Sequence, residues 1–393
     1  MLKIYFKKVI GQIKKPFNLF IENLNGGNES LSKRCLIYYK TDPFYRDLKS
    51  LKLSHTNNDE ILMMVDVLNQ LGYIVDVVDR SLNNFKPKDK YDLFIGNASG
   101  NSGKRYYEIA SKLNKSKKII YCTGPEPTLS NSLVKERYDS FNKKNKTKTS
   151  YKRTTDIRFE EFLSISDSIF SFGEKNQFCD QSYKQKSRLP IYNILPSVDE
   201  SLYFENSWLK SRKLNKFLCF AGSGAICKGV DILIEAFEYF PELELHVCSP
   251  NDDDIQVLRS IYPKRFKSNI FYHGFVKPGS KKLNFLTSSC SFSILNSAAE
   301  GCCTSLIATM TCGLVPIMNY ECGINIFDDR IKIISKEDKL QSTINTLKNI
   351  LLLEKDSYEN LVEKTLQESK KYGKHKYTSS LKSALIKFEQ NYM

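Results

Sequence analysis

At 393 residues, the chain is long enough for two domains of ordinary size, and its hydrophobic content of 41% is that of a globular protein. A net charge of +15, from 59 Lys and Arg against 44 Asp and Glu, favours an anionic partner such as phosphate, lipid head groups or nucleic acid. The eleven cysteines form no Cys-x-x-Cys pair and the four histidines have no metal-ligand spacing, which excludes the usual zinc sites and favours reduced core thiols in a cytosolic protein.

Two basic segments supply most of the positive charge. Residues 1–24 alternate basic and apolar side chains, which predicts an amphipathic helix that lies on an anionic membrane surface or packs on the first domain. Lysines interrupt the apolar core that a signal peptide would need. Residues 135–153 are too charged for a core, so we expect an exposed loop or helix there. Its basic face would suit nucleic acid or lipid phosphate, or simply solvent.

Strand and helix patterns alternate along the whole chain. The predicted strands cover residues 34–39, 73–78, 91–96, 118–122, 168–172, 191–195, 217–221, 243–248, 269–272, 291–295 and 315–318. This alternation predicts an α/β fold with a doubly wound parallel sheet in each half. The expected parts are a lead segment and linker (1–33), an N-terminal domain (34–207), a C-terminal domain (208–372) with its hinge at 208–215, and a terminal helix that crosses back to the first domain (373–393).

Ligands of such sheets bind at the loops that follow the carboxyl ends of the strands. In the first half these loops contain His55, Asn57, Thr123 and Gly124, and we expect them to face one crevice, with His55 as a candidate for ligand binding. His55 is the only histidine in these loops, and the alternative is an ordinary surface residue.

A glycine-rich turn opens the second half, with Gly222, Ser223, Gly224 and Lys228 after a predicted strand. Such a turn lets backbone N–H groups approach a phosphate, and a lysine adds a charge-assisted hydrogen bond. The segment is no Walker loop, because Gly-Lys-Ser/Thr is missing, and it lacks the third glycine of a dinucleotide fingerprint.

A lone carboxylate, Glu300, follows the strand predicted at 291–295. Gly301, Cys302, Cys303 and Thr304 then lead into a helix that should end near residue 313. The position predicts a ligand-binding site at the end of a buried strand. An ordinary βαβ unit with a solvated glutamate is the alternative.

These segments resemble glycosyltransferase family 4. Glu300-Gly301, the helical segment, Cys312-Gly313 and the apolar strand are similar to the family's donor motif, and Lys228-Gly229 is similar to its diphosphate loop. Leu195-Pro-Ser-Val-Asp199 is similar to the Pro-x-x-Val-Asp step before the domain crossover. Two positions depart from the family pattern. Ala308 stands where the family has a second glutamate, and Ser223 stands where it usually has arginine.

The resemblance implies the GT-B arrangement, in which two Rossmann-like domains face a cleft. The implied activity is a retaining, metal-independent transfer of a sugar from a UDP- or GDP-linked donor to a glycan or lipid-linked acceptor, in the synthesis of lipopolysaccharide, capsule or exopolysaccharide. No cofactor and no nucleic-acid partner are expected, and the protein would work in the cytoplasm, on the inner face of the cytoplasmic membrane.

Glu300 and Lys228 would then be catalytic, and the first-half loop residues His55, Asn57, Thr123 and Gly124 would bind the acceptor. The residues implied to complete the nucleotide-sugar site are Gly222, Ser223, Gly224, Phe275, Val276, Gly301, Cys302, Cys303 and Thr304. The two departures leave open a protein that binds a nucleotide sugar without catalysing transfer. The positive charge leaves open a nucleic-acid-binding protein.

Overall fold

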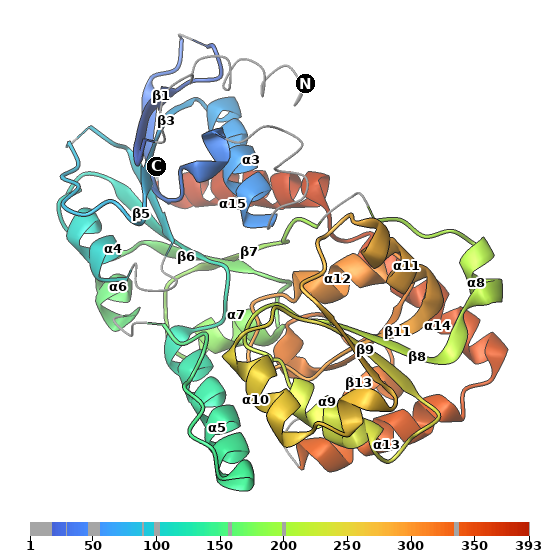
Figure 1. The fold of residues 1–393 in the computed structure, drawn as a ribbon. Coiled ribbons are helices and arrows are strands. Elements are labelled where there is room, and N and C mark those ends of the chain that lie inside the picture. The colour runs from blue at the N-terminus through green and yellow to red at the C-terminus, as the bar shows by residue number, and fades with distance from the viewer. Residues whose placement is uncertain are drawn as a thin grey trace.

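The chain folds into two α/β lobes joined by extended segments (Figure 1). The computed structural model describes residues 18–28, 30–45, 56–88, 90–97, 103–155, 159–198, 202–333 and 338–392. Among these residues, no helix combines the length and the apolar character that crossing a bilayer requires.

A seven-stranded sheet forms the core of the N-terminal domain, in the order β1-β3-β2-β4-β5-β6-β7. Its strands are β1 (Phe20–Leu24), β2 (Lys33–Tyr39), β3 (Tyr73–Asp79), β4 (Leu93–Asn97), β5 (Lys117–Cys122), β6 (Ser168–Phe172) and β7 (Ile191–Ile194). All neighbours pair in parallel except β1, which is antiparallel to β3. Helices cover both faces, so the central strands are continuous apolar runs without polar alternation.

The helices of this domain connect successive strands. They are α3 (Thr56–Gln70), α4 (Gly103–Ala110), α5 (Pro127–Asn145), α6 (Phe159–Ile165) and α7 (Phe178–Lys184). Ile61, Val65 and Leu68 form an apolar stripe on one face of α3 and are fully buried. The strand order reverses between β2 and β4, and the loops after these strands therefore flank a crevice.

The C-terminal domain has a six-stranded parallel sheet in the order β10-β9-β8-β11-β12-β13. Its strands are β8 (Lys213–Phe220), β9 (Glu244–Cys248), β10 (Ile270–Gly274), β11 (Cys290–Leu295), β12 (Val315–Asn319) and β13 (Lys332–Ile333). The strand order reverses between β8 and β11. The loops that follow these two strands therefore lie side by side, which places the two predicted motifs next to each other.

Eight helices of the described residues accompany this half of the chain. They are α8 (Ser207–Ser211), α9 (Val230–Phe237), α10 (Asp253–Ile261), α11 (Lys281–Ser289), α12 (Thr304–Met310), α13 (Lys339–Leu351), α14 (Lys355–Ser369) and α15 (Lys374–Tyr392). The last of them, α15, leaves the second domain and packs on α3 and β7 of the first. Leu381, Leu385 and Phe388 are buried in that contact.

The structure corrects the expected helix of the lead segment. Residues 20–24 form strand β1, which pairs with β3 through partners such as Phe20 and Val78. Ile21 and Leu24 are buried, so pairing and burial at the sheet edge outweigh the helical spacing of the apolar residues. Residues 1–17 lie outside the described part of the chain.

The expected hinge at 208–215 is also wrong, because that segment is built into the C-terminal domain as α8 and the start of β8. The buried guanidinium of Arg212 donates hydrogen bonds to the carbonyl groups of Thr287, Cys312 and Gly313, at 2.6, 2.5 and 2.9 Å. These bonds fix the segment to its own domain.

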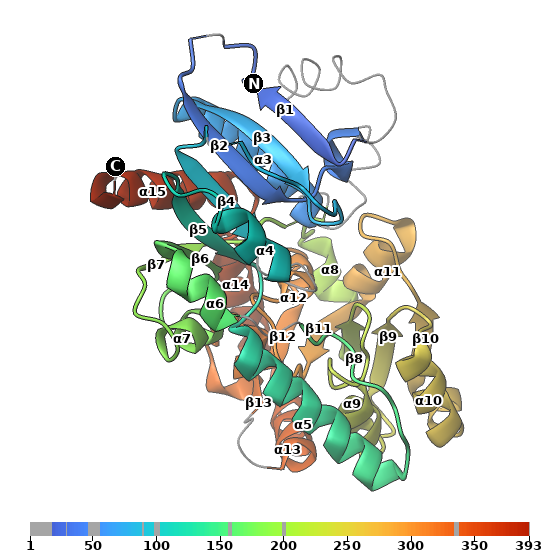
Figure 2. The same cartoon turned by 90° about the vertical axis from the view of Figure 1, so that its left-hand side faces the viewer.

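The basic segment at 135–153 is only partly exposed, contrary to expectation. Figure 2 shows α5 running from the first domain down along the second, beside α9. Arg137, Tyr138 and Phe141 on its inner face are buried. Arg137 donates a hydrogen bond from Nη2 to the carbonyl oxygen of Asn296, 3.0 Å away in the loop after β11. The helix therefore acts as a strut between the domains.

Candidate active site

A cavity of about 760 Å³ lies between the two domains. The N-terminal domain lines it with the start of α3, the turn after β5, the start of α5 and residues 153–155. The C-terminal domain contributes the loops that follow β8, β10 and β11. Among the described residues that line it, the charged ones are Arg80, Arg153, Lys228 and Glu300.

Lys228 reaches the cavity from the loop after β8, and its side chain is buried. The next residue, Gly229, fixes this position. Its φ is +78°, and a Cβ atom there would lie 2.2 Å from the carbonyl oxygen of Asn296, so only glycine fits. The loop after β8 is thereby pressed against the loop after β11.

Glu300 lies in that second loop and is 7% exposed. Its Oε1 pairs with Nζ of Lys228 and accepts a hydrogen bond of 2.8 Å from Oγ of Ser297, while its Oε2 lies 3.4 Å from Nη2 of Arg153. Burial would raise the pKa of this carboxyl, but the charges of Lys228 and Arg153 prevail and lower the pKa to about 2. Glu300 is therefore an anion at neutral pH.

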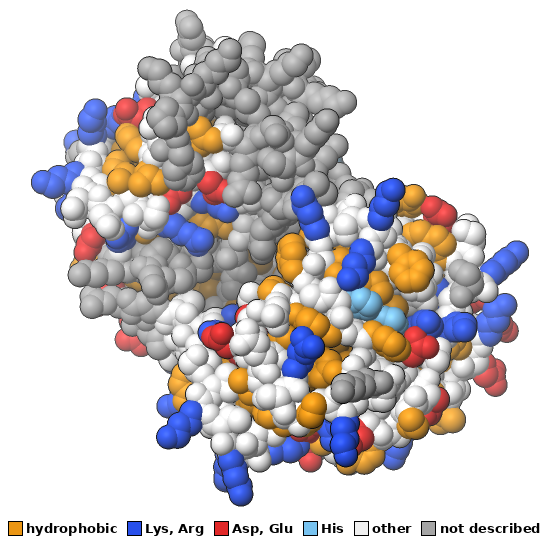
Figure 3. Space-filling model, viewed as in Figure 1, with side chains coloured by type: hydrophobic (Ala, Val, Ile, Leu, Met, Phe, Trp, Pro, Cys, Tyr) orange, Lys and Arg blue, Asp and Glu red, His pale blue; other side chains and the backbone are white. Residues whose placement is uncertain are grey.

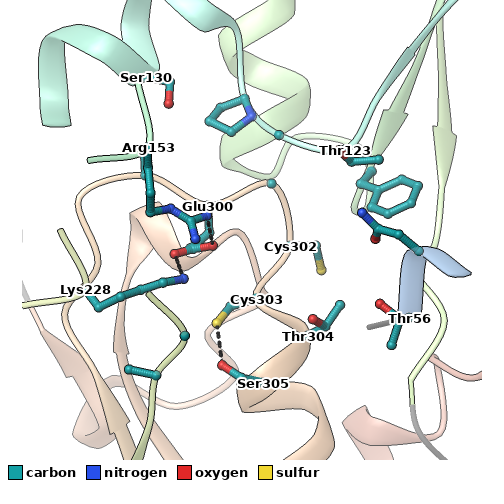
Figure 4. A pocket seen from close by; sticks show the side chains of 18 of the residues that line it. Thr56, Thr123, Ser130, Arg153, Lys228, Glu300, Cys302, Cys303, Thr304 and Ser305 are labelled. Carbon is teal, nitrogen blue, oxygen red and sulfur yellow. Dashed lines mark hydrogen bonds and ion pairs between the residues drawn. The ribbon is translucent and has the colours of Figure 1, made fainter. Parts of the chain in front are cut away.

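Arg153 is a site residue that the sequence did not reveal. It belongs to the N-terminal domain, in the segment between α5 and α6, and reaches across the cavity to the carboxylate of the other domain (Figure 4). In that view Arg153 comes down from above Glu300 and Lys228 approaches from below. The sequence carried no signal for this contact beyond the basic character of residues 135–153.

Part of the chain is similar to a known protein family. Residues 206–367 match the family model described as glycosyl transferases group 1. This matched region lies within the C-terminal half of the chain. A search of curated proteins gave no match.

Solved glycosyltransferases share the fold of the whole chain. Sucrose-phosphate synthase from Thermosynechococcus elongatus superposes with a TM-score of 0.60 and 12% identity, covering 92% of this chain and 99% of that one. HepE from Anabaena, in complex with UDP and glucose, gives 0.58 and 11%, covering 92% and 100%. An alpha-glucosyltransferase in complex with UDP and a 13-mer DNA gives 0.51 and 14%, covering 92% and 100%. At these identities the likeness shows the fold, which is GT-B.

Most of the predicted nucleotide-sugar residues line the cavity. They are Gly222, Lys228, Phe275, Val276, Glu300, Gly301, Cys302, Cys303 and Thr304. Ala308, which stands in place of the family's second glutamate, also lies in the wall.

Two predicted loop residues, Ser223 and Gly224, are not part of the lining. The backbone N–H of Gly224 donates a hydrogen bond to Oδ2 of Asp252 at 3.0 Å, and that of Ile226 donates to Asp254 at 3.1 Å. Asp252 and Asp254 thus accept hydrogen bonds from backbone N–H groups of the turn that we predicted to bind phosphate. Side-chain cations therefore matter more in this site than the glycine turn suggested.

On the acceptor side, Asn57, Thr123 and Gly124 line the cavity as the sequence placed them. The carbonyl of Gly124 accepts hydrogen bonds from the thiol of Cys179 and, at 2.8 Å, from the hydroxyl of Tyr183, which fixes the turn after β5. His55, the remaining acceptor candidate, lies outside the described residues.

The cysteines of the cavity wall are neutral at physiological pH. Burial raises the pKa of Cys302 and of Cys303, and the neighbouring charge of Glu300 raises both further. All eleven cysteines are buried and free of disulfides. Within the described part of the chain, no group of three His, Cys, Asp or Glu side chains could hold a metal ion.

Proposed function

We propose that this protein transfers a sugar from a nucleotide-diphosphate donor to an acceptor bound against the N-terminal domain. The observation that carries the proposal is the charge of the cavity, where the described lining residues supply three cations and one carboxylate. Lys228 and Glu300 are buried, and a surplus of positive charge in such a site favours an anionic ligand. A nucleoside diphosphate has that charge.

The fold supports the same reading. A group 1 glycosyltransferase domain carries the Lys228 and Glu300 loops, and GT-B structures of the same architecture were solved with UDP bound. UDP is therefore the first donor nucleotide to test, followed by GDP. The cavity of about 760 Å³ has the size of an ordinary small-molecule site.

Lys228 would stabilise the charge that develops on the leaving diphosphate, where a fixed cation contributes most. Glu300 would accept hydrogen bonds from hydroxyl groups of the donor sugar. A carboxyl with a pKa of about 2 holds no proton at neutral pH, and Glu300 is therefore unsuited to act as a general acid. Its role in the proposal is to orient the sugar and to oppose positive charge on the ring.

The finer part of the proposal follows the resemblance to glycosyltransferase family 4. Transfer would proceed with retention of the anomeric configuration, without a metal ion or a cofactor, onto a glycan or a lipid-linked acceptor of a surface polysaccharide. Such an acceptor would bring the protein to the inner face of the cytoplasmic membrane. On the face drawn in Figure 3, Lys and Arg side chains of the described residues are spread over the C-terminal domain without forming one patch. The candidates for membrane contact are the basic residues of segments 1–24 and 135–153.

The first experiment measures the melting temperature with UDP, GDP, ADP and the corresponding nucleotide sugars, with and without EDTA. A ligand present at about 100 times its Kd stabilises the fold by about 2.7 kcal/mol. We expect one nucleotide and its sugar to raise the melting temperature, equally well with EDTA. If no nucleoside diphosphate does so, the proposed function is wrong.

A binding protein without transferase activity is the second candidate. Ala308 and Ser223 favour it, because each replaces a charged residue of the family pattern. Release of the nucleoside diphosphate from the stabilising donor, in the presence of a glycan or lipid-linked acceptor pool, separates the two. Steady release supports transfer, and tight binding without release supports the binding protein.

A further inference from the structure

We propose that Arg153, from the N-terminal domain, is the second cation that binds the donor's diphosphate, so that the donor site is complete only when both domains are in contact. The inference rests on the proposed function. It adds a residue of the N-terminal domain to the donor site of the C-terminal domain. It also accounts for the uncharged Ser223 in the loop after β8.

Arg153 lies close to both Glu300 and Gly224 of the C-terminal domain. Its Nη2 lies 3.4 Å from Oε2 of Glu300, and its Cδ lies so close to Gly224 that a Cβ atom at that position would be 3.2 Å away. The side chain thus lies across the loop that also carries Lys228. The two cations contact different oxygens of the same carboxylate, and both line the cavity.

The positive charges around Glu300 outnumber its single negative charge. Lys228 and Arg153 together exceed the single negative charge of Glu300, and Lys228 is the closer partner of that carboxylate. A guanidinium has five N–H donors in a planar fork, so a single contact of 3.4 Å leaves donors for a second anion. The fork matches the oxygens of a phosphate and can bind two of them at once.

The segment around Arg153 is held in place by contacts on both sides. Arg153 has a φ of 64°, a left-handed conformation that is uncommon for any residue except glycine. Such conformations persist where the surrounding structure enforces them, and they cluster at ligand-binding sites. Thr155 and Asn131 exchange two hydrogen bonds of 2.9 Å on one side of Arg153. On the other side, Lys152 forms an ion pair of 2.8 Å with Asp253 of the second domain.

The strut of α5 links this site to the contact between the domains. Arg137 and Tyr138 of α5 bind Asn296 and Asp254 of the second domain, and the chain then turns back from α5 to Arg153. If the domains separate, Arg153 leaves the loop that carries Lys228. Binding of a diphosphate by both cations therefore favours the closed arrangement, and closure strengthens binding.

Titration calorimetry with UDP and UMP, or with GDP and GMP if the wild-type protein binds GDP instead, tests the inference on wild-type protein, Arg153→Ala, Arg153→Lys, Lys228→Ala and Lys148→Ala. Lys148 is an exposed residue of the same basic segment and controls for net charge. We expect Arg153→Ala to weaken UDP at least tenfold, to weaken UMP less, and to leave the melting temperature of the free protein within a few degrees. Arg153→Lys should recover part of the affinity, and Lys148→Ala should bind UDP within twofold of wild type.

The outcomes separate the two proposals. If the wild-type protein binds neither UDP nor GDP, the proposed function fails and the inference fails with it. If Lys228→Ala loses UDP while Arg153→Ala binds it as wild type does, the proposed function stands and the inference is overturned. An equal loss for UDP and UMP in Arg153→Ala would assign Arg153 to domain geometry alone, which also overturns it.

Discussion

The hydroxyl of Tyr138 donates a hydrogen bond of 2.7 Å to Oδ2 of Asp254, and this bond joins α5 of the N-terminal domain to α10 of the C-terminal domain. Both side chains are fully buried, and the same carboxylate oxygen accepts the backbone N–H of Ile226. The contact therefore ties the strut to the loop that carries Lys228.

Tyr138→Phe should lower the free energy of unfolding by about 1.5 to 3 kcal/mol, because it removes a buried hydrogen bond to a charged group. Urea unfolding measures the change. Tyr151→Phe is the matched control, since Tyr151 makes a bond of the same kind and length to Asp139 but is 42% exposed. Its loss should cost less than about 0.5 kcal/mol. Equal effects in the two variants would show that the Tyr138 bond has no special role.

Lys228→Ala should weaken binding of the nucleoside diphosphate by about 1.5 to 3 kcal/mol, or roughly tenfold to 150-fold in Kd. It should also destabilise the free protein, because Glu300 remains buried with the 3.4 Å contact to Arg153 as its remaining ion pair and the hydrogen bond from Ser297 as its other partner. Adding Glu300→Gln should recover most of that stability without restoring affinity. Calorimetry and urea unfolding follow the two effects separately. A double variant no more stable than Lys228→Ala alone would contradict the assigned ion pair.

Glu300→Gln should lower turnover about 100-fold or more while UDP affinity stays the same or rises slightly. The change keeps the shape of the side chain and removes its charge, which weakens its hydrogen bonds to sugar hydroxyls most when positive charge grows on the ring. The same change frees Lys228 and Arg153 for phosphate. Comparing kcat with the Kd for UDP checks this prediction. Wild-type turnover would remove Glu300 from the mechanism.

Gly301→Ala should separate the domains at the cavity. A Cβ atom at Gly301 would lie 2.3 Å from the carbonyl oxygen of Thr123, a backbone atom of the other domain that cannot rotate away. We expect a loss of a few kcal/mol in stability, as for other overpacked positions, together with reduced transfer. Gly222→Ala serves as the stability control, because a Cβ atom there meets nothing within 4 Å. If the two variants melt alike, the close approach of the domains is not needed for stability.

Glu60→Gln should change how stability depends on pH. Glu60 is fully buried beside Ser197, which follows β7. The backbone N–H of Ser197 donates a hydrogen bond of 3.0 Å to Oε1 of Glu60, and its hydroxyl donates one of 3.1 Å to the same atom. Burial raises the pKa of Glu60 from 4.5 to about 7. The folded protein therefore holds a proton that the unfolded chain releases between these values, and the stabilisation present below pH 4.5 is lost as the pH rises through 7.

The loss amounts to at most about 3 kcal/mol. The glutamine variant has no such titration, so its stability relative to wild type should rise between pH 4.5 and 8. Urea unfolding at both pH values measures the shift. Glu300→Gln is the control, because the pKa of Glu300 lies below its ordinary value; its titration falls below pH 4.5, so its stability relative to wild type should stay constant across this range. A constant difference between Glu60→Gln and wild type across this range would contradict the prediction.

Local signals in the sequence were sufficient to predict the sheets, because parallel strands that are buried on both faces have continuous apolar runs. All eleven strands predicted from the sequence coincide with strands of the structure. The switch point of the second sheet then brings Lys228 and Glu300 together, as the resemblance implied. Strand β1 escaped prediction because it lies at a sheet edge, where the pairing with β3 decides its conformation.

Arg153 could not be predicted, because its role depends on the placement of one domain against the other. The residues around it read as a solvated basic segment, and only tertiary contacts distinguish the buried Arg137 and Tyr138 from the exposed lysines between them and Arg153. The N–H of Gly224 escaped for a similar reason, since its acceptor Asp252 lies 28 positions further along the chain. A sequence motif describes the spacing of residues within one segment. It cannot predict these contacts, because each of them joins two segments that are far apart in the sequence.

The return of α15 to the first domain has a consequence for folding during synthesis. Tyr377 of this helix is fully buried, and its hydroxyl lies 3.1 Å from that of Tyr121 in β5. Until the ribosome has released this helix, the N-terminal domain exposes the apolar face that Leu381, Leu385 and Phe388 later cover. The second domain can complete its sheet before the first acquires its last helix, although domains usually mature in chain order. Chains truncated before residue 374 should therefore expose that face and aggregate.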